Sequence, residues 1–355
     1  MMFYNSITKS IQMKASVQTL LQGIHWDSKQ SLGGVTFVPI IGELENHSSG
    51  IEIGAEDLDT IQVTELEPED VNNVNIHSEY QGTVLIIAGM VLMGGRQTRS
   101  PTRPFIINKG TKYKIPVNCI EQGRWSYTPG DAVDKNEKQF KMMKRMVSHK
   151  TRSSYAGGGM SQSSTWNSIS HYMSEHDLSD IDIPTQSYLG VEEAIKSNSG
   201  EELDKIRTLL KPVFSHEHQR GVLMFESGKL TNIEVFDNPD YWMKISTQMM
   251  ESNLIDVLKL QKEEEKKINE NLDFGKIKIE KSNPVADEIS YSTKFENQTG
   301  WAIEDDAKIV YFNLTQKIEG GNDSFSQARF QTNNFESMGE QVIRSQEQED
   351  PSDLE

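Results

Sequence analysis

Residues 220–236, RGVLMFESGKLTNIEVF, give the clearest structural signal in the chain. Two runs of β-branched and aromatic residues lie on either side of Gly228, a pattern typical of two antiparallel strands joined by a tight turn. The following residues, 241–260, space their large apolar side chains close to one helical face, which predicts a long amphipathic helix. These apolar residues are Trp242, Ile245, Met249, Leu254 and Leu258.

Further strands are expected on both sides of this hairpin. Residues 35–41, VTFVPII, predict a strand, and residues 83–97, TVLIIAGMVLMGGRQ, predict two buried strands joined by a tight turn. Residues 105–117, FIINKGTKYKIPV, predict a second hairpin, and residues 119–127 continue as an extended segment. Two more strands are expected around residues 291–295 and 308–315.

Helical signals are shorter and fewer. Residues 10–21 predict a leading helix, and residues 201–210 predict another that stops before Pro212. Trp166, Ile169 and Met173 fit one helical face. Together the elements predict an α+β fold: a β-rich, mostly antiparallel domain with a few helices packed on it and a disordered acidic C-terminal tail.

The domain boundaries follow from changes in composition. We predict a helical lead over residues 1–22, a single domain over 23–316 and a disordered polar tail over 317–355. Within the domain, residues 130–165 or so predict a flexible insertion that begins basic and helix-prone and becomes rich in Gly and Ser. Residues 261–273 or so predict a charged connection.

Composition narrows the possible functions. The 355 residues carry 36 Lys and Arg against 53 Asp and Glu, so the net charge is −17, which argues against non-specific binding along DNA. The basic run at residues 141–152, KMMKRMVSHKTR, therefore predicts a solvated or partner-facing helix rather than a nucleic-acid contact. Cys119 is the single cysteine, which excludes an intrachain disulfide and a cysteine-based zinc site.

No membrane segment is expected. The N-terminus lacks the continuous apolar region of a secretory signal, and the longest apolar stretch, residues 83–93, is about half the length that a transmembrane helix needs. The sequence therefore predicts a cytoplasmic protein.

Two segments carry a family resemblance: residues 88–100, AGMVLMGGRQTRS, and residues 115–127, IPVNCIEQGRWSY. They resemble the core signature of the ARPP domain, which is named for its association with ADP-ribosylglycohydrolases and rhodanese-phosphatases. The matching positions are Gly95, Gln97, Arg99, Val117, Cys119, Glu121, Gly123, Arg124 and Trp125. The resemblance extends from about residue 33 to residue 315. It implies a setting in nucleotide or ADP-ribose metabolism.

The same signature shows two departures. Met90 stands where the family usually has an acidic residue, and Thr98 stands where it usually has Asn. If either family residue takes part in binding or catalysis, this chain has altered or lost that step.

The signature also contains the candidate ligand-binding residues, which are Arg96, Gln97, Arg99, Arg124 and Trp125. Arginine offers planar, bidentate donors for phosphate or carboxylate, and Trp125 can stack on a base or a ribose-linked ring. Alternatively, Glu121 pairs with Arg99 or Arg124 inside the fold and Trp125 fills the core.

Glu121 is the candidate general acid or base. Cys119 is either a nucleophile or a small buried hydrophobic residue. His216 and His218 could chelate a metal if their segment is extended, but a polar loop explains them equally well, and no metal site is predicted.

The leading hypothesis is recognition of a small anionic ligand, nucleotide-like or ADP-ribose-like, by these residues. The alternatives are a hydrolase that uses Glu121 as base on such a ligand, and a structural or protein-binding role through the helix at 241–260 or the tail. No cofactor is predicted, a membrane partner is not expected, and the negative charge makes nucleic acid an unfavoured partner.

Overall fold

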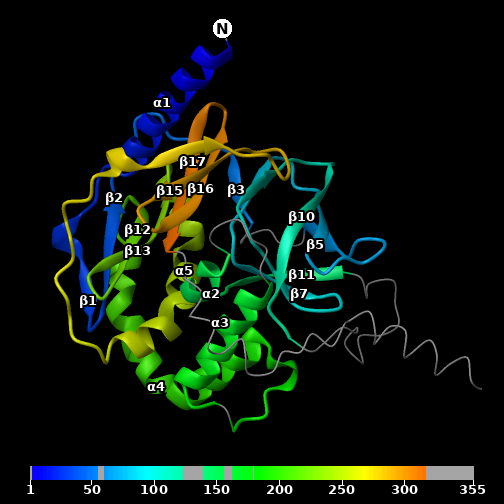
Figure 1. Cartoon of the computed structure of the whole chain (residues 1–355), viewed down its shortest axis with the longest axis vertical. Helices are drawn as coiled ribbons and strands as arrows, with labels where there is room; N and C mark the ends of the chain where they lie inside the picture. The colour runs from blue at the N-terminus through cyan, green and yellow to red at the C-terminus, as the bar shows by residue number, and fades with distance from the viewer. Residues whose placement is uncertain (1, 55–59, 123–138, 156–161, 179, 317–355) are drawn as a thin grey trace, which may run out of the picture. The chain divides into compact units, whose positions relative to one another are not determined.

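The computed structural model describes residues 2–54, 60–122, 139–155, 162–178 and 180–316, with side chains described from residue 11 and excepting Pro184. All of these residues belong to one compact unit (Figure 1). The predicted tail, residues 317–355, and residues 130–138 and 156–161 of the predicted insertion lie outside the described residues. The fold is α+β, and its strands are mostly antiparallel, as the sequence predicts.

The largest element is an eight-stranded antiparallel sheet that contains the hairpin at 220–236. Its order is β1-β2-β12-β13-β17-β16-β15-β14. The strands are β1 (Gln30–Leu32), β2 (Val35–Ile41), β12 (Gln219–Glu226), β13 (Lys229–Phe236), β14 (Lys278–Lys281), β15 (Ile289–Phe295), β16 (Gln298–Asp305) and β17 (Lys308–Gln316). Strands β1, β14 and β16 are additions to the five predicted from sequence in this sheet, which are those at residues 35–41, the two of the hairpin at 220–236, and those around 291–295 and 308–315.

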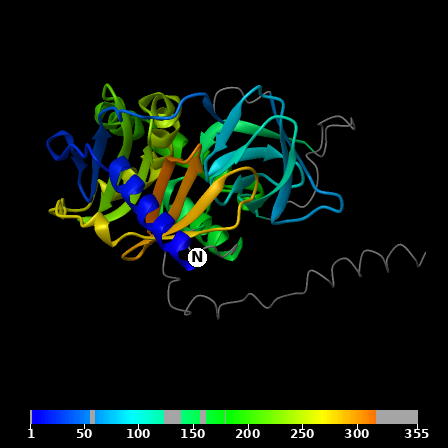
Figure 2. The same cartoon turned by 90° about the horizontal axis from the view of Figure 1, so that it is seen from above.

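A closed six-stranded barrel forms the second β element. Its order is β10-β5-β4-β11-β7-β8, with β4 (Ile61–Thr64), β5 (Asn73–Ser78), β7 (Met90–Gly94), β8 (Arg99–Pro101), β10 (Lys112–Cys119) and β11 (Gln139–Met146). A three-stranded sheet, β3-β6-β9, accompanies it, with β3 (Ile51–Ile53), β6 (Thr83–Ile86) and β9 (Phe105–Ile107). Figures 1 and 2 show the barrel strands in cyan, grouped to one side of the large sheet.

Helices cover both faces of the large sheet because neighbouring strand residues point to opposite sides. Val222 and Met224 belong to the core cluster that includes α4 (Tyr188–Phe214) and α5 (Pro239–Leu260). Leu223 and Phe225 belong to the cluster under α1 (Met2–Leu20), which lies across the opposite face (Figure 2). The remaining helices are α2 (His149–Ser153) and α3 (Gln162–Glu175), with short 3-10 turns η1 (Trp26–Ser28), η3 (Pro184–Gln186) and η4 (Phe274–Lys276).

Several predicted elements are confirmed. The hairpin at 220–236 is β12–β13, the amphipathic helix at 241–260 is α5, and the leading helix is α1. None of the described helices is long and apolar enough to cross a membrane.

Two predicted strand pairings are wrong. Strands β6 and β7 both form within residues 83–97, but β6 pairs with β3 and β9, whereas β7 pairs with β11 and β8. Similarly, β9 and β10 do not form a hairpin, because β10 pairs with β5 and β8. In both cases the turn carries the chain from one sheet to the other, a choice that local turn chemistry does not determine.

The secondary structure differs at two further places. Residues 141–146 of the basic run belong to strand β11 rather than to a helix, since Phe140 and Met142 are buried, alternate with exposed residues and pair with β4 and β7. Residues 149–152 of the run lie in the short helix α2. Helix α4 continues through Pro212 instead of stopping before it. Pro212 lies in the last turn, so its ring costs one hydrogen bond to the preceding turn and the helix continues for only two more residues, Val213 and Phe214, which are buried in the core.

Candidate functional site

The predicted ligand residue Arg99 lies inside the barrel with no exposed side-chain surface. Its Nη2 lies 3.0 Å from Glu65, whose side chain is equally sealed, and its Nη1 donates to the carbonyl oxygens of Asp70 at 2.8 Å and Asn73 at 3.2 Å. Arg99 starts β8 and Glu65 follows β4, strands that are three places apart around the six-stranded barrel in either direction. The ion pair therefore connects opposite walls of the barrel.

The candidate base Glu121 is 8% exposed and held by three donors. Its Oε2 accepts from Thr98 N and Thr98 Oγ1, both at 3.0 Å, and its Oε1 accepts from Thr185 Oγ1 at 2.9 Å. Thr98, which stands where the family usually has Asn, thus donates two hydrogen bonds to this carboxylate. Its backbone and hydroxyl fix the carboxylate orientation.

The structure describes two of the other predicted ligand-binding residues, Gln97 and Arg96. Gln97 is 6% exposed and donates to the carbonyl oxygen of Glu121 at 3.0 Å. Arg96 is partly exposed and pairs with Glu69 at 3.2 Å. Arg124 and Trp125 lie outside the described residues. The structure therefore brings Gln97 and Glu121 together and directs the side chain of Arg99 to Glu65.

Cys119 is fully buried in β10 beside this cluster, and its backbone N–H donates to Gln162 Oε1 at 2.8 Å. Burial raises the pKa of the Cys119 thiol to about 11. The thiol is therefore protonated at neutral pH, the state in which it is a poor nucleophile.

We expect Cys119 in the native protein to react with iodoacetamide at pH 8 at least ~100-fold more slowly than in denaturant, since raising the pKa depletes the thiolate. Mass spectrometry of timed samples measures both rates. Equal rates in the folded and denatured protein would contradict the buried placement.

Of the two histidines considered as metal ligands, His216 and His218, the second contacts a carboxylate. Nδ1 of His218 lies 2.8 Å from an oxygen of Glu43. Among the residues that the structure describes, no group of three or more His, Cys, Asp or Glu side chains is arranged to hold a metal ion.

A hollow in the described part of the chain lies elsewhere, between the large sheet, α2 and the barrel. Its volume is about 300 Å³. Ala88 and Thr102 line it from the barrel side. Arg152 of α2 and Tyr155, two residues after that helix, line it as well, together with ten residues of the large sheet. The sheet residues are Lys278, Glu280, Ser292, Thr293, Lys294, Thr299, Gly300, Trp301, Asn313 and Thr315.

The floor of this cavity is a polar part of the sheet face that packs helices elsewhere. On β17, Phe312 and Leu314 point into the core beneath α1, so Asn313 and Thr315 point to the opposite side. Further along the same face, Val222 of β12 packs against the helices. The same face of the sheet is therefore apolar where α4 and α5 pack on it and polar where α2 lies above it.

Arg152 is the central charged group of the cavity. Its side chain is 5% exposed, and its Nη1 lies 2.5 Å from Glu234 Oε1, whose other oxygen accepts from the Tyr311 hydroxyl. Its Nε and Nη2 are buried without a hydrogen-bond partner among the described residues. Nη1 of Arg152 is thus used by Glu234, whereas Nε and Nη2 remain available to hydrogen-bond a ligand in the cavity.

Tyr155 adds a second available donor. The phenol is 6% exposed, and its hydroxyl has no partner among the described residues. Burial raises the pKa of Tyr155, so the hydroxyl is protonated at neutral pH and can donate to an anion. The Thr299 hydroxyl in the cavity wall is likewise buried without a described partner.

Local structure explains why Arg152 reaches this place. Ser148 caps α2 by accepting from Thr151 N, which fixes the start of the helix that carries Arg152. Gly89 has φ +93°, and a Cβ there would lie 2.4 Å from Arg152 Cδ. The glycine between Ala88 and Met90 in the family signature therefore makes room for the arginine stem.

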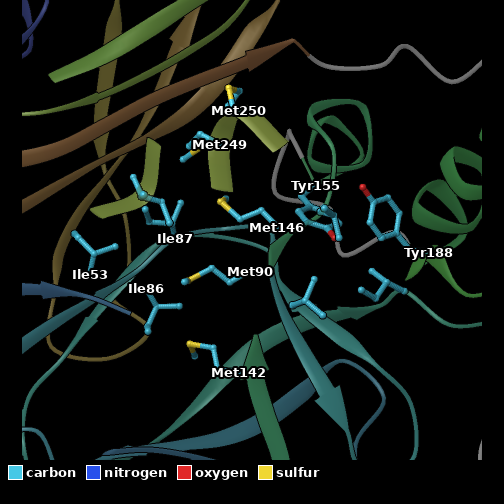
Figure 3. Close-up of a cluster of buried hydrophobic side chains, with 14 of the residues drawn as sticks. Ile53, Ile86, Ile87, Met90, Met142, Met146, Tyr155, Tyr188, Met249 and Met250 are labelled. Atoms are coloured by element: carbon cyan, nitrogen blue, oxygen red, sulfur yellow. The ribbon is translucent and has the colours of Figure 1, made fainter. Parts of the chain in front are cut away.

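Met90, the other family departure, lies in a methionine-rich core next to this region. Figure 3 shows Met90 with Met142, Met146 and Met249, and with Tyr155 at the side of the cluster. Met90 is 1% exposed. An ionised carboxylate in its place would require a buried partner, so the methionine suits the apolar surroundings in this chain.

Comparison with protein families matches residues 23–320 to ARPP-1, the ARG and Rhodanese-Phosphatase-superfamily-associated Protein domain. The chain belongs to this family. The ARPP-1 match covers the eight-stranded sheet, the barrel, the three-stranded sheet and all described helices except α1. No curated protein matches the chain, and no solved structure does.

The sequence predicted the signature residues as the site but did not predict the cavity residues Arg152 and Tyr155. Arg152 is the last residue of the basic run and Tyr155 follows it, and the sequence places both in the predicted flexible insertion. The signal that could have found them is Gly89, because a glycine inside an apolar strand pattern indicates a close approach by another part of the chain.

Proposed function

We propose that this ARPP-1 chain recognises a small anionic ligand, nucleotide-like or ADP-ribose-like, in the cavity at Arg152. The observation that carries the proposal is the buried guanidinium whose Nε and Nη2 have no described partner. A guanidinium remains charged at all physiological pH values, and leaving its buried N–H groups unsatisfied is costly. A phosphate or carboxylate oxygen pair fits that free edge.

The charge of the cavity supports an anion. Three basic side chains line it, Arg152, Lys278 and Lys294, together with the carboxylate of Glu280. With Arg152 paired to Glu234 behind the wall, the two lysines still leave one positive charge in excess. This basic lining occurs in a chain of net charge −17. A hollow with low-dielectric walls concentrates such a local field and attracts a ligand of the opposite sign.

The rest of the lining suits a nucleotide. Trp301 supplies an aromatic ring, which is already stacked by the Arg103 guanidinium at 3.8 Å from its centroid. Thr299, Asn313 and Thr315 offer hydroxyl and amide groups for ribose or base atoms. The volume of about 300 Å³ lies within the range of small-molecule sites. The family association with ADP-ribose chemistry supports the same class of ligand, and such a ligand agrees with the predicted cytoplasmic location.

Ligand-dependent stabilisation tests the proposal. We expect at least one of AMP, NAD and ADP-ribose to raise the Tm, with a gain of about 2.7 kcal/mol when the ligand is 100-fold above its Kd. We expect Arg152→Gln/Glu234→Gln to lose at least ~10-fold in affinity, because the pair is removed without leaving Glu234 buried alone. Thermal unfolding and calorimetric titration measure these effects.

The matched control is Arg207→Gln. Arg207 pairs with Glu251 and Asp204 at the surface of α4, away from the cavity lining, and the change should leave ligand affinity within about twofold. Absence of stabilisation by all three compounds, or unchanged affinity in the folded double variant, would reject the proposed site.

The two alternatives predict other results in the same experiments. A hydrolase with Glu121 as base predicts turnover that disappears in Glu121→Gln while binding persists. A structural or protein-binding role predicts no response to small anions. Helix α5 buries most of its apolar residues and leaves Met243 70% exposed, so a partner at that helix would contact its first turn.

A further inference from the structure

The cavity floor has a regular layout that follows from strand register. Lys278 of β14 pairs with Lys294 of β15, which pairs with Thr299 of β16, which pairs with Thr315 of β17. Residues in register point to the same side of a sheet. These four side chains therefore form a row across the strands, with the two lysines at one end.

A second row lies two residues further along each strand. It contains Glu280, Ser292, Trp301 and Asn313, and it ends at Glu234 of β13. Arg152 is bound to that last carboxylate. The guanidinium and the lysine pair therefore occupy opposite ends of one polar trough.

The separation of these charged ends is set by the sheet. From β13, whose Glu234 holds Arg152, to β15, which carries Lys294, is three strand spacings, or ~14 Å. The flexible lysine stems can shorten this gap. A single phosphate at Arg152 would leave the lysines unused, whereas a second anionic group on the same ligand would reach them.

Lys278 and Lys294 form a like-charge pair at the exposed end of the cavity. Like charges directly opposite on neighbouring strands repel each other, and an anionic group between the two ammonium groups would relieve that repulsion. Glu280 is diagonal to Lys294 on the same face, so one carboxylate faces two ammonium groups.

We infer that the ligand carries two separated anionic groups, one held by Arg152 and the other by Lys278 and Lys294, with its sugar or base over Trp301. The ligand class is a nucleotide with a second phosphate away from the first, such as a nucleoside bisphosphate. This inference rests on the proposed function of the cavity.

The test compares AMP with adenosine 3′,5′-bisphosphate, which adds one distant phosphate to the same nucleoside. In the wild-type chain we expect the bisphosphate to bind about tenfold more tightly than AMP, the gain of one additional charge-assisted contact. In Lys278→Gln/Lys294→Gln we expect that preference to vanish, while the Kd of AMP stays within about twofold. Calorimetric titration gives all four constants.

Lys281→Gln is the matched control, because Lys281 is on the same strand one residue beyond Glu280 and points to the other face. It should retain the tenfold preference. Equal affinities of the wild-type chain for the two compounds, with AMP binding still dependent on Arg152, would overturn the second subsite and leave the proposed function intact. A bisphosphate preference that survives removal of both lysines would also overturn it. If neither compound binds the wild-type chain, both proposals fall together.

Discussion

Arg99→Leu is expected to lower the free energy of unfolding by ~3–5 kcal/mol, because it leaves the Glu65 carboxylate buried without its counter-charge. Both side chains are fully inaccessible, and they join opposite walls of the barrel. The change also removes the donors to the carbonyl oxygens of Asp70 and Asn73. Equilibrium unfolding in urea measures the loss.

Two further variants separate the ion pair from packing. Arg99→Met/Glu65→Gln removes both charges and keeps an acceptor for the Arg96 N–H, so it should recover a large part of the loss. Arg96→Ala interrupts the partly exposed pair with Glu69 and should cost about 1 kcal/mol or less. A wild-type stability in Arg99→Leu would contradict the buried connection and would return Arg99 to the set of ligand candidates.

Arg220→Met is expected to destabilise the chain by about 3 kcal/mol, since it removes the donors of several buried carbonyl groups at once. Arg220 is 1% exposed and donates to the carbonyl oxygens of Leu20, Gln22, Gly42 and Phe236. Burial lowers the pKa of Arg220 to about 10, so it remains charged at neutral pH. Urea unfolding again measures the effect.

The Arg220 side chain connects the predicted helical lead at 1–22 to the predicted domain. Two of its acceptors belong to the end of α1 and the residues just after it, and two belong to the large sheet. We expect hydrogen exchange in Arg220→Met to rise first at residues 11–23. Protection there equal to that of the wild-type chain would show that the apolar face of α1, and not Arg220, anchors the helix.

The family signature has two physical roles in this structure. Thr98, Arg99 and Glu121 form hydrogen bonds or ion pairs that fix one end of the barrel. Ala88 and Gly89 form part of the cavity and admit the Arg152 stem. The residues that carry the resemblance therefore build the frame around the cavity, while its principal cation comes from α2.

The sequence alone determined the elements whose signal is local. The hairpin at 220–236 and the helix at 241–260 are periodic over enough residues that burial of one face admits a single secondary structure. It also determined the fold class and the family, because these follow from the succession of strands and from residues 88–125. The internal pairing of Arg99 with a carboxylate was one of its two alternatives, with Glu121 rather than Glu65 as the expected partner.

Only the tertiary structure decided which strands pair and where the charged groups meet. Local signals place β6 beside β7 and β9 beside β10, but hydrogen bonding distributes them between two sheets. Arg152 and Glu234 are 82 residues apart, and Lys278 lies a further 44 residues beyond Glu234, so no spacing in the sequence relates the three. The cavity is formed by contacts between distant segments, and the free energy of those contacts depends on packing that a local pattern does not encode.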